Sequence, residues 1–362
     1  MREIPRWCAS GASSARRRVR VGLDLQLATG TSTGIGEYAS GLLAALRAEG
    51  ADVVALRDER FDPWRFDRRV LWDQVLLPLA AKRARVDLVH CSAGTMPLLS
   101  PVPAVVTVHD VAWMRVQAHA RPYARAYFGA FALARYRRAR RILVDSAFSR
   151  DELLAVAPQL DPGRIDIVYP GVAADIASVV RARDDEAPFV LAVGTVERRK
   201  NLETLVRAVA AIPKLRLVAA GPPTPYVDRC REVARETGAG DRIEFRGYVP
   251  RGDLLALYAR AALAAVPSRY EGFGYAAAQA LCAGVPLLAS NAASLPEIVR
   301  DAAPLLAPED WAAWSAAILA GLDAREEREA AAHARRSENV ARFGWPQSAR
   351  AALRCYAAAW AQ

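Results

Sequence analysis

A glutamate, Glu271, stands between a short apolar run and a glycine-containing turn in the C-terminal half of the chain. The apolar run Leu263–Val266 predicts a strand, and the alanine-rich stretch after Gly274 predicts a helix. A strand–turn–helix of this kind places Glu271 at the carboxyl end of a strand and directs helix N–H groups toward the same place. We therefore expect this turn to contact a phosphorylated, hydroxyl-rich ligand.

A second group of candidates follows another predicted strand, Phe189–Val193. After this strand, the turn Gly194-Thr195 leads to Arg199 and Lys200. Cations at the start of a helix oppose the helix dipole unless an anion is present, although a solvated charge cluster is the alternative interpretation. A guanidinium offers a forked pair of donors and an ammonium a mobile point charge, which suits a departing diphosphate. We predict that Arg199 and Lys200 are catalytic and neutralise such a group without a metal ion.

His109 and Asp110 end the apolar run 104–108, at the carboxyl end of a predicted strand. A polar pair in that place faces the ligand-binding edge of a parallel sheet more often than the core, and a structural role is the alternative. We predict a catalytic role for His109 and a structural role for His90, which is similarly placed. The four histidines lack metal-ligand spacing and no Asp-x-Asp doublet stands at a strand end, so we expect no metal site.

Glycines also open a predicted helix near the start of the chain, in the stretch from Gly30 to Tyr38. Glycine lets a backbone approach a ligand closely, and the helix that starts at Glu37 leaves N–H groups for a phosphate. The dinucleotide spacing Gly-x-Gly-x-x-Gly is absent, so a structural turn is the alternative. We predict that Gly34 and Gly36 bind part of the ligand.

Apolar, β-branched runs alternate with helical patterns along the chain, which predicts an α/β fold of parallel sheets with crossover helices. The predicted strands are Val19–Leu25, Val53–Leu56, Leu88–Cys91, Ala104–His109, Ile142–Ser146, Ile165–Tyr169, Phe189–Val193, Leu215–Ala220, Ile243–Phe245, Leu263–Val266 and Pro286–Ala289.

The strands fall into two sets, so we expect two α/β domains, each with its own core. The expected segments are a disordered basic tail (1–18), an N-terminal domain (19–172), a linker (173–188), a C-terminal domain (189–344) and a helix that packs across the domain junction (345–362).

Length and composition agree with a two-domain globular protein. The chain has 362 residues, of which 53% are hydrophobic, enough for two separate cores. The five cysteines are scattered and without Cys-x-x-Cys spacing, which argues against a disulfide framework and indicates a reducing cytoplasm. No window offers the roughly 18 uninterrupted apolar residues of a membrane-spanning helix. We therefore expect a cytoplasmic protein.

The net charge of +10 is compatible with nucleic acid, an anionic membrane or a phosphorylated substrate as partner. The sequence contains no recognised nucleic-acid-binding module and no strand face that interleaves aromatic and basic residues, so we expect no nucleic-acid partner. A helix predicted over residues 122–141 combines aromatic side chains with a basic end. It suits contact with the inner face of an anionic membrane, and core packing with a solvated polar face is the alternative.

Together, the motifs resemble the retaining glycosyltransferases of family 4, which have the GT-B fold, over nearly the whole chain from Val21. The motifs that carry the resemblance are Gly34-Ile-Gly36-Glu37-Tyr38, Trp72-Asp-Gln-Val-Leu-Leu-Pro78, Asp87-Leu-Val-His90, His109-Asp110, Ser146-Ala-Phe-Ser149-Arg150, Val168-Tyr-Pro-Gly171-Val172, Val193-Gly-Thr195 through Arg199-Lys-Asn201, Phe245-Arg-Gly247-Tyr-Val249, Pro267-Ser268 through Glu271-Gly-Phe-Gly274, Gly284-Val-Pro286 and Pro296-Glu297. The form Gly-Thr-x-Glu-x-Arg-Lys-Asn is similar to bacterial mannosyltransferases of surface-polysaccharide assembly.

The resemblance implies a GT-B architecture of two Rossmann-like domains whose parallel sheets face a deep interdomain cleft. In this architecture the N-terminal domain (19–172) lies on the acceptor side and the C-terminal domain (189–344) binds the nucleotide sugar. The donor is then a nucleoside-diphosphate sugar, with GDP-mannose as one candidate, and no cofactor is expected. Glu271 matches the first of two glutamates in the family motif, whereas the second position holds Gln279 and the usual proline after the turn is Ala276. An amide cannot accept two charge-assisted hydrogen bonds, so we expect donor binding to be weaker by about 1–3 kcal/mol. The residues implied to contact the donor are Gly34, Gly36, Gly194, Thr195, Val249, Gly272, Phe273, Gly274 and Gln279.

We therefore expect a metal-independent, retaining hexosyltransferase, with mannose favoured, in which Glu271, His109, Arg199 and Lys200 are catalytic. The expected acceptor is a glycan or a polyprenyl-diphosphate-linked oligosaccharide in lipopolysaccharide, that is O-antigen, or exopolysaccharide assembly. The alternative, which Gln279 favours, is a non-catalytic nucleotide-sugar-binding or scaffold protein.

Overall fold

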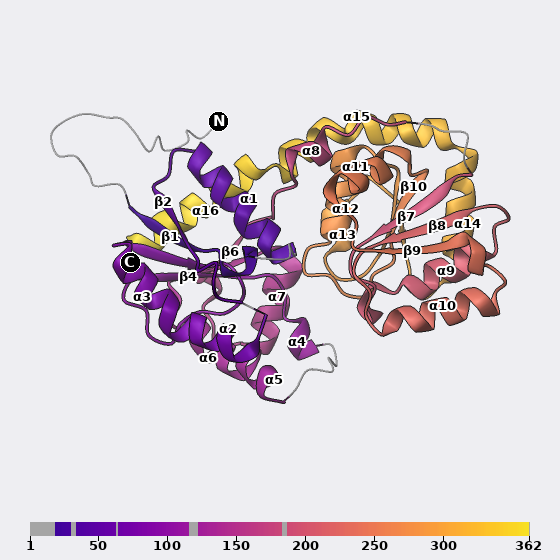
Figure 1. Cartoon of the computed structure of the whole chain (residues 1–362). Helices are drawn as coiled ribbons and strands as arrows, with labels where there is room; N and C mark the ends of the chain where they lie inside the picture. Colours follow the sequence, from indigo (N-terminus) through magenta and orange to yellow (C-terminus); the bar gives the residue numbers. More distant parts are fainter. Residues whose placement is uncertain (1–18, 30–33, 63, 116–121, 183–186, 362) are drawn as a thin grey trace.

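The computed structural model describes residues 19–29, 34–62, 64–115, 122–182 and 187–361. The expected basic tail and residues 30–33 of the first glycine-rich turn lie outside these ranges. Figure 1 shows two α/β halves, with the N-terminal one in indigo to magenta and the C-terminal one in magenta to orange. Every predicted strand is present, with each end within two residues of the prediction.

The N-terminal sheet has six parallel strands in the order β2-β1-β3-β4-β5-β6. Its strands are β1 (Val21–Asp24), β2 (Val53–Leu56), β3 (Leu88–Cys91), β4 (Ala104–Val108), β5 (Arg141–Val144) and β6 (Ile165–Ile167). Strands β1, β3 and β4 are buried along their whole length because helices cover both faces of the sheet. This burial explains why they appear in the sequence as continuous apolar runs rather than alternating ones.

The helices of this half are η1 (Gln26–Ala28), α1 (Gly34–Ala48), α2 (Phe66–Leu71), η2 (Trp72–Leu76), α3 (Leu77–Arg83), α4 (Ala112–Arg115), α5 (Pro122–Phe128), α6 (Ala130–Tyr136), α7 (Ala147–Val156) and η3 (Pro162–Arg164). The single helix predicted over residues 122–141 is wrong. Gly129, with φ −101° and ψ −101°, interrupts it between α5 and α6. Its last residue, Arg141, instead begins β5 and binds Asp166 of the neighbouring strand at 2.6 Å.

The C-terminal sheet is also parallel, in the order β12-β11-β10-β7-β8-β9. Its strands are β7 (Phe189–Val193), β8 (Arg216–Ala220), β9 (Ile243–Gly247), β10 (Leu263–Val266), β11 (Leu287–Ser290) and the short edge strand β12 (Leu305–Leu306), which was not predicted. The helices are α8 (Ala174–Ala177), η4 (Arg198–Lys200), α9 (Leu202–Ala210), α10 (Tyr226–Glu236), η5 (Gly240–Arg242), α11 (Arg251–Arg260), α12 (Tyr275–Ala283), α13 (Leu295–Val299), α14 (Trp311–Asp323) and α15 (Arg325–Phe343).

Two segments connect the halves. Residues 172–179 contain α8, and Val172, Ile176 and Val179 are buried in the core of the C-terminal half. Helix α16 (Trp345–Trp360) returns to the N-terminal half, where Figure 1 shows it beside α1. Its buried face, which includes Tyr356, joins the core that α1 forms with the sheet. The last helix therefore completes the first domain.

Trp345 is the first residue of α16, and its indole ring lies between two glycines, Gly41 and Gly171. A Cβ atom added to Gly41 of α1 would lie 2.1 Å from Cζ2 of Trp345, and one added to Gly171 would lie 2.1 Å from Cδ2. Any side chain at either position would therefore collide with the ring unless the ring or the backbone shifted. The closeness of α16 to the first domain depends on these two glycines.

We predict that Gly171→Ala lowers the free energy of unfolding by about 1–3 kcal/mol, because overpacking a filled site costs this much. Gly240→Ala is the matched control, since a methyl group there meets nothing within 4 Å. Chemical denaturation of both variants measures the difference. Equal stability of the two variants would contradict the wedged arrangement.

Candidate active site

Glu271 is buried just beyond β10 and accepts hydrogen bonds from three side chains. Nζ of Lys200 lies 2.5 Å from Oε1, Nη1 of Arg199 lies 3.3 Å from Oε2, and Oγ of Ser268 lies 2.7 Å from Oε1. Burial, the largest influence, favours the neutral acid, but the two cations and their hydrogen bonds hold the pKa of Glu271 below its ordinary value. The predicted catalytic residues Glu271, Arg199 and Lys200 therefore form one charged cluster.

A buried asparagine fixes the turn that delivers the two cations. Asn201 has φ 56° and lies between η4 and α9, and its amide nitrogen donates to the carbonyls of Pro267 at 3.1 Å and Pro308 at 2.7 Å. The backbone N–H of Arg269 donates to the carbonyl of Arg199 at 2.8 Å. These bonds tie the turn after β7 to the end of β10. Sequence reasoning gave Asn201 no role.

The exposure of the cluster differs between its members. The side chains of Lys200 and Arg199 are 21% and 24% exposed, whereas that of Glu271 is 6% exposed. The carboxylate thus lies behind the cations, and an incoming anion would meet the cations first. Arg199 also pairs with Glu197 at 2.8 Å, so its orientation is set from two sides.

A small, open pocket adjoins the cluster at the carboxyl ends of β7 and β10. Its lining includes Gly194, Thr195, Lys200 and Ser268. Gly194 has φ 125°, a conformation suited to glycine, and a Cβ added there would lie 3.6 Å from Cε of Lys200. The structure therefore brings the predicted Gly194-Thr195 turn beside the charged cluster.

The turn after Glu271 touches the opposite domain. A Cβ added to Gly272 would lie 2.3 Å from the carbonyl oxygen of His109, so only glycine fits. Gly274, with φ 91°, precedes the first turn of α12. The side chain of Phe273 is buried in the core, with its ring 5.7 Å from that of Tyr169, so only its backbone could contact a ligand.

His109 is held by two acceptors within its own domain. Nδ1 lies 2.7 Å from Oδ2 of Asp145, and Nε2 lies 2.9 Å from the carbonyl oxygen of Ser92. A carbonyl only accepts, so Nε2 carries a proton, and the carboxylate favours a second proton on Nδ1. Burial, the largest influence, opposes the charged ring, but Asp145 outweighs it and raises the pKa of His109. Both ring nitrogens of His109 are therefore bonded within its own domain, and Asp145 favours the protonated ring more than water would.

His90 has the structural role that we predicted for it. It is fully buried, with Nδ1 at 2.7 Å from the hydroxyl of Tyr356 and Nε2 at 2.7 Å from that of Thr107. Burial lowers the pKa of His90 to about 3, so the ring is neutral. It links the sheet of the first domain to α16.

The remaining predicted residues lie outside the charged cluster. Gly36 packs against the backbone of η1, where an added Cβ would be 2.7 Å from the carbonyl of Leu27, whereas a Cβ added to Gly34 would meet nothing within 4 Å. Oε1 of the buried Gln279 accepts a hydrogen bond from the hydroxyl of Tyr258 in α11 at 3.0 Å. Val249 packs against the core of the second domain.

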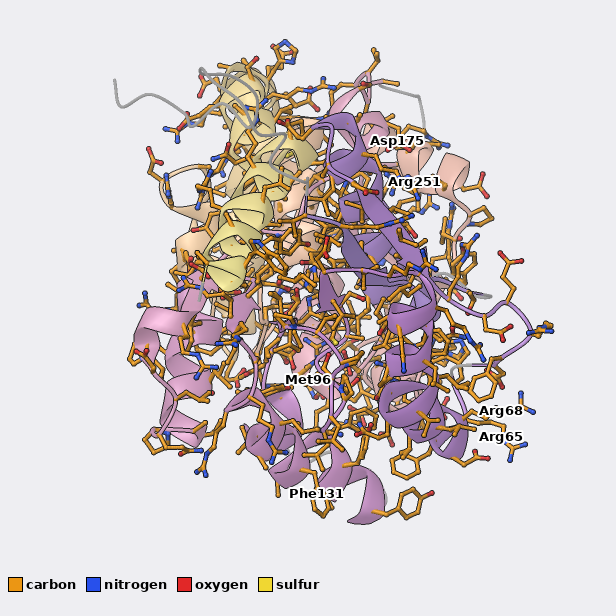
Figure 2. All side chains as sticks on the ribbon, turned by 90° about the vertical axis from the view of Figure 1, so that its left-hand side faces the viewer. Arg65, Arg68, Met96, Phe131, Asp175 and Arg251 are labelled. Atoms are coloured by element: carbon orange, nitrogen blue, oxygen red, sulfur yellow. The ribbon has the colours of Figure 1, made fainter. Side chains whose placement is uncertain are left out.

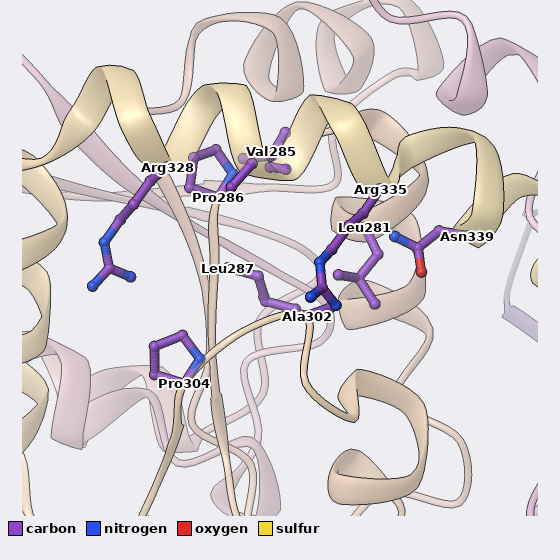
Figure 3. Close-up of a pocket in the computed structure, with 11 residues that line it drawn as sticks. Leu281, Val285, Pro286, Leu287, Ala302, Pro304, Arg328, Arg335 and Asn339 are labelled. Atoms are coloured by element: carbon purple, nitrogen blue, oxygen red, sulfur yellow. The ribbon is translucent and has the colours of Figure 1, made fainter.

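A second pocket, of ≈ 550 Å³, lies between α15 and the start of β11, and Figure 3 shows Arg328 and Arg335 of α15 above its apolar floor. Its lining contains none of the predicted site residues. Among the residues that the structure describes, no group of three His, Cys, Asp or Glu side chains could hold a metal ion. Within the same ranges, no helix is long and apolar enough to cross a bilayer.

Two family models match the chain. The model for Glycosyltransferase Family 4 matches residues 32–176, and the model for Glycosyl transferases group 1 matches residues 175–338. The second region contains β7, the cation turn and Glu271, and the first contains His109.

Curated relatives include the D-inositol 3-phosphate glycosyltransferases of two bacteria. The Mycobacterium marinum protein is 30% identical over 231 residues, which cover 60% of this chain and 49% of the relative. The Mycolicibacterium smegmatis protein is 32% identical over 234 residues, which cover 60% of this chain and 53% of the relative. The chain thus spans about half the length of these relatives.

Solved structures resemble the whole chain at lower identity. Sucrose-phosphate synthase from Thermosynechococcus elongatus has a TM-score of 0.74 at 23% identity, covering 95% of this chain and 100% of that one. HepE from Anabaena, in complex with UDP and glucose, has a TM-score of 0.72 at 15% identity, covering 94% of this chain and 100% of that one. The chain therefore has the GT-B glycosyltransferase fold, in which a region that matches family 4 precedes one that matches group 1.

Proposed function

We propose that the protein is a retaining glycosyltransferase that moves a hexose, with mannose favoured, from a nucleoside-diphosphate sugar to an acceptor hydroxyl. The observation that carries the proposal is the cluster of Glu271, Lys200 and Arg199 at the carboxyl edge of a parallel sheet. Ligands of open α/β sheets bind at that edge. The group 1 match over residues 175–338 and the resemblance to a structure with bound UDP and glucose support this donor class.

In the proposed reaction, the bond from the anomeric carbon to the diphosphate oxygen breaks while the acceptor oxygen bonds to the same face. The acceptor proton passes to an oxygen of the leaving diphosphate. Lys200 and Arg199 stabilise the charge that develops on that group, so no divalent metal is required. Glu271 holds both cations in place and orients the sugar, while the imidazolium of His109 supplies a fixed positive charge nearby.

Two acceptor classes are compatible with this chemistry. The relatives' name points to a phosphorylated inositol, and the motif resemblance points to a glycan or polyprenyl-diphosphate-linked oligosaccharide of surface-polysaccharide assembly. We favour the second class, because exposed apolar side chains gather on the first domain near arginines. The ring of Phe66 in α2 lies against that of Tyr123 in α5, with the centroids 4.6 Å apart and the planes tilted by 53°. Figure 2 shows Phe131 at the bottom of that domain and Arg65 and Arg68 at its lower right. This surface suits the cytoplasmic face of an anionic membrane.

We predict that Lys200→Met lowers kcat/KM for transfer roughly 100- to 1,000-fold, because one donor to a developing oxyanion contributes this much. Glu271→Gln should act in the same direction through the loss of both ion pairs. Lys214→Met removes an equal charge from an exposed position and serves as the control. Transfer is followed with radiolabelled GDP-, UDP- and dTDP-sugars and both acceptor classes. Near-normal transfer by both site variants would overturn the proposal.

The charge on His109 predicts a pH-dependent contribution to stability. Its pKa is raised from the ordinary value of 6.5. The stabilisation is therefore complete below the unfolded-state value and is lost as the pH rises through the higher folded-state value. We predict that the stability difference between the wild type and His109→Gln shrinks as the pH rises above the ordinary histidine pKa of 6.5. Chemical denaturation at several pH values measures this stability difference, and His333→Gln, at an exposed histidine, is the control. A difference that stays constant with pH would refute the protonation of His109.

A second candidate function, donor binding without transfer, rests on Gln279. Its amide oxygen is already bonded to Tyr258, so the position offers a ligand less acceptor capacity than a carboxylate would. We predict that Gln279→Glu tightens donor binding about tenfold, as expected for one added charge-assisted hydrogen bond. Gln347→Glu adds the same charge on α16 and is the calorimetric control. Transfer that appears only in Gln279→Glu would favour the binding protein, and unchanged or weaker affinity would refute this account of the position.

A further inference from the structure

Glu297, in α13 of the second domain, binds the start of α7 in the first domain. Its carboxylate accepts from the backbone N–H of Ala147 at 2.9 Å and from that of Phe148 at 3.3 Å. The hydroxyl of Tyr169 donates to Oε1 at 2.8 Å. All three donors lie before the linker, so each bond joins the two domains.

The carboxylate of Glu297 supplies hydrogen-bond acceptors that the start of α7 lacks within its own domain. The first N–H groups of a helix have no partner within the helix and carry the positive end of its dipole. The first turn of α7 contains no acidic residue, and the hydroxyl of its N-cap Ser146 accepts from the third N–H group, that of Ser149. The carboxylate that satisfies the first two N–H groups comes from the other domain, so α7 is capped fully only while the domains are in contact.

A second contact between the domains lies directly beside Glu271. The hydroxyl of Ser146 donates to the carbonyl of Gly272 at 2.5 Å. The hydroxyl of Ser149 lies 2.9 Å from the same carbonyl and 3.0 Å from that of His109. Gly272 follows Glu271 in the chain, so hydroxyls of the first domain hold the backbone that carries the buried carboxylate.

The backbone of Glu297 is itself held in place within the second domain. Arg342, near the end of α15, donates to the backbone carbonyls of Glu297 at 2.6 Å and of Ile298 at 2.9 Å. Its guanidinium also lies over the ring of Tyr169, 5.4 Å from the centroid. The five-residue helix α13 is therefore held rigidly enough to present its carboxylate to α7.

We propose that Glu297, Ser146 and Ser149 form a clasp that closes the two domains and sets the position of the Glu271–Gly272 turn. The three are positioning residues, and their effect on catalysis rests on the proposed transferase function. The cations and Glu271 all belong to the second domain, so a donor can bind without the clasp. Transfer, in contrast, needs the turn in the closed position.

The test is Glu297→Gln, which keeps the shape of the side chain but removes its charge and places an amide NH₂ near helix N–H groups. We expect kcat to fall about 10- to 100-fold, the loss for charge-assisted hydrogen bonds, while the dissociation constant of the nucleoside diphosphate stays within about twofold. Glu232→Gln, which breaks an exposed pair with Arg229 on α10, is the control. Unchanged kcat, or a loss of donor affinity as large as the loss of kcat, would overturn the proposal.

Small-angle X-ray scattering separates the clasp from the function. The radius of gyration of Glu297→Gln should exceed that of the wild type, with and without nucleoside diphosphate, even if the wild type transfers no sugar. If Glu297→Gln does not fold, Ser149→Ala provides the same comparison, because it removes one donor to Gly272 and leaves α7 capped by Ser146. Equal radii in the wild type and the folded variant would refute the clasp.

Discussion

The structure depends on one buried carboxylate that two cations share. Taking Glu271 out of water costs several kcal/mol, and the attraction of Lys200 and Arg199 offsets that cost only while both remain close. This requirement explains the bonds that surround the cluster: Asn201 ties the cation turn to the end of β10, and Ser268 gives the carboxylate a third donor. The cluster is therefore preformed, with its two cations partly exposed and the carboxylate of Glu271 behind them.

The two sheets put this group where the domains meet. Parallel strands present their carboxyl ends at one edge, and the residues after β4, β5 and β10 touch each other across the junction. Asp145 and the carbonyl of Ser92 occupy both ring nitrogens of His109, and Asp145 favours the protonated ring. His109 is therefore poorly suited to accept a proton from the acceptor hydroxyl. The proposed same-face reaction assigns that proton to the leaving diphosphate. The electrostatics of the site and the proposed mechanism are thus consistent with each other.

Sequence reasoning located the fold and the charged cluster well, because both depend on local patterns. Buried parallel strands appear as apolar runs, and the turns that bear Gly194, Lys200 and Glu271 follow directly from strand ends. It failed where a partner is distant in the sequence. The pairing of Glu297 with α7 and of Asn201 with Pro308 joins residues whose proximity no local pattern indicates. The break at Gly129 was also missed, because the helical pattern continues on both sides of it.

The central claim is that protein cations, and not a divalent ion, receive the diphosphate of the donor. A crystal structure with a bound nucleoside diphosphate, grown in the presence of a chelator, tests it most directly. The account predicts that Nζ of Lys200 and the guanidinium of Arg199 lie about 3 Å from oxygens of the distal phosphate. A diphosphate bound elsewhere, or bound only when a divalent ion is supplied, would contradict it.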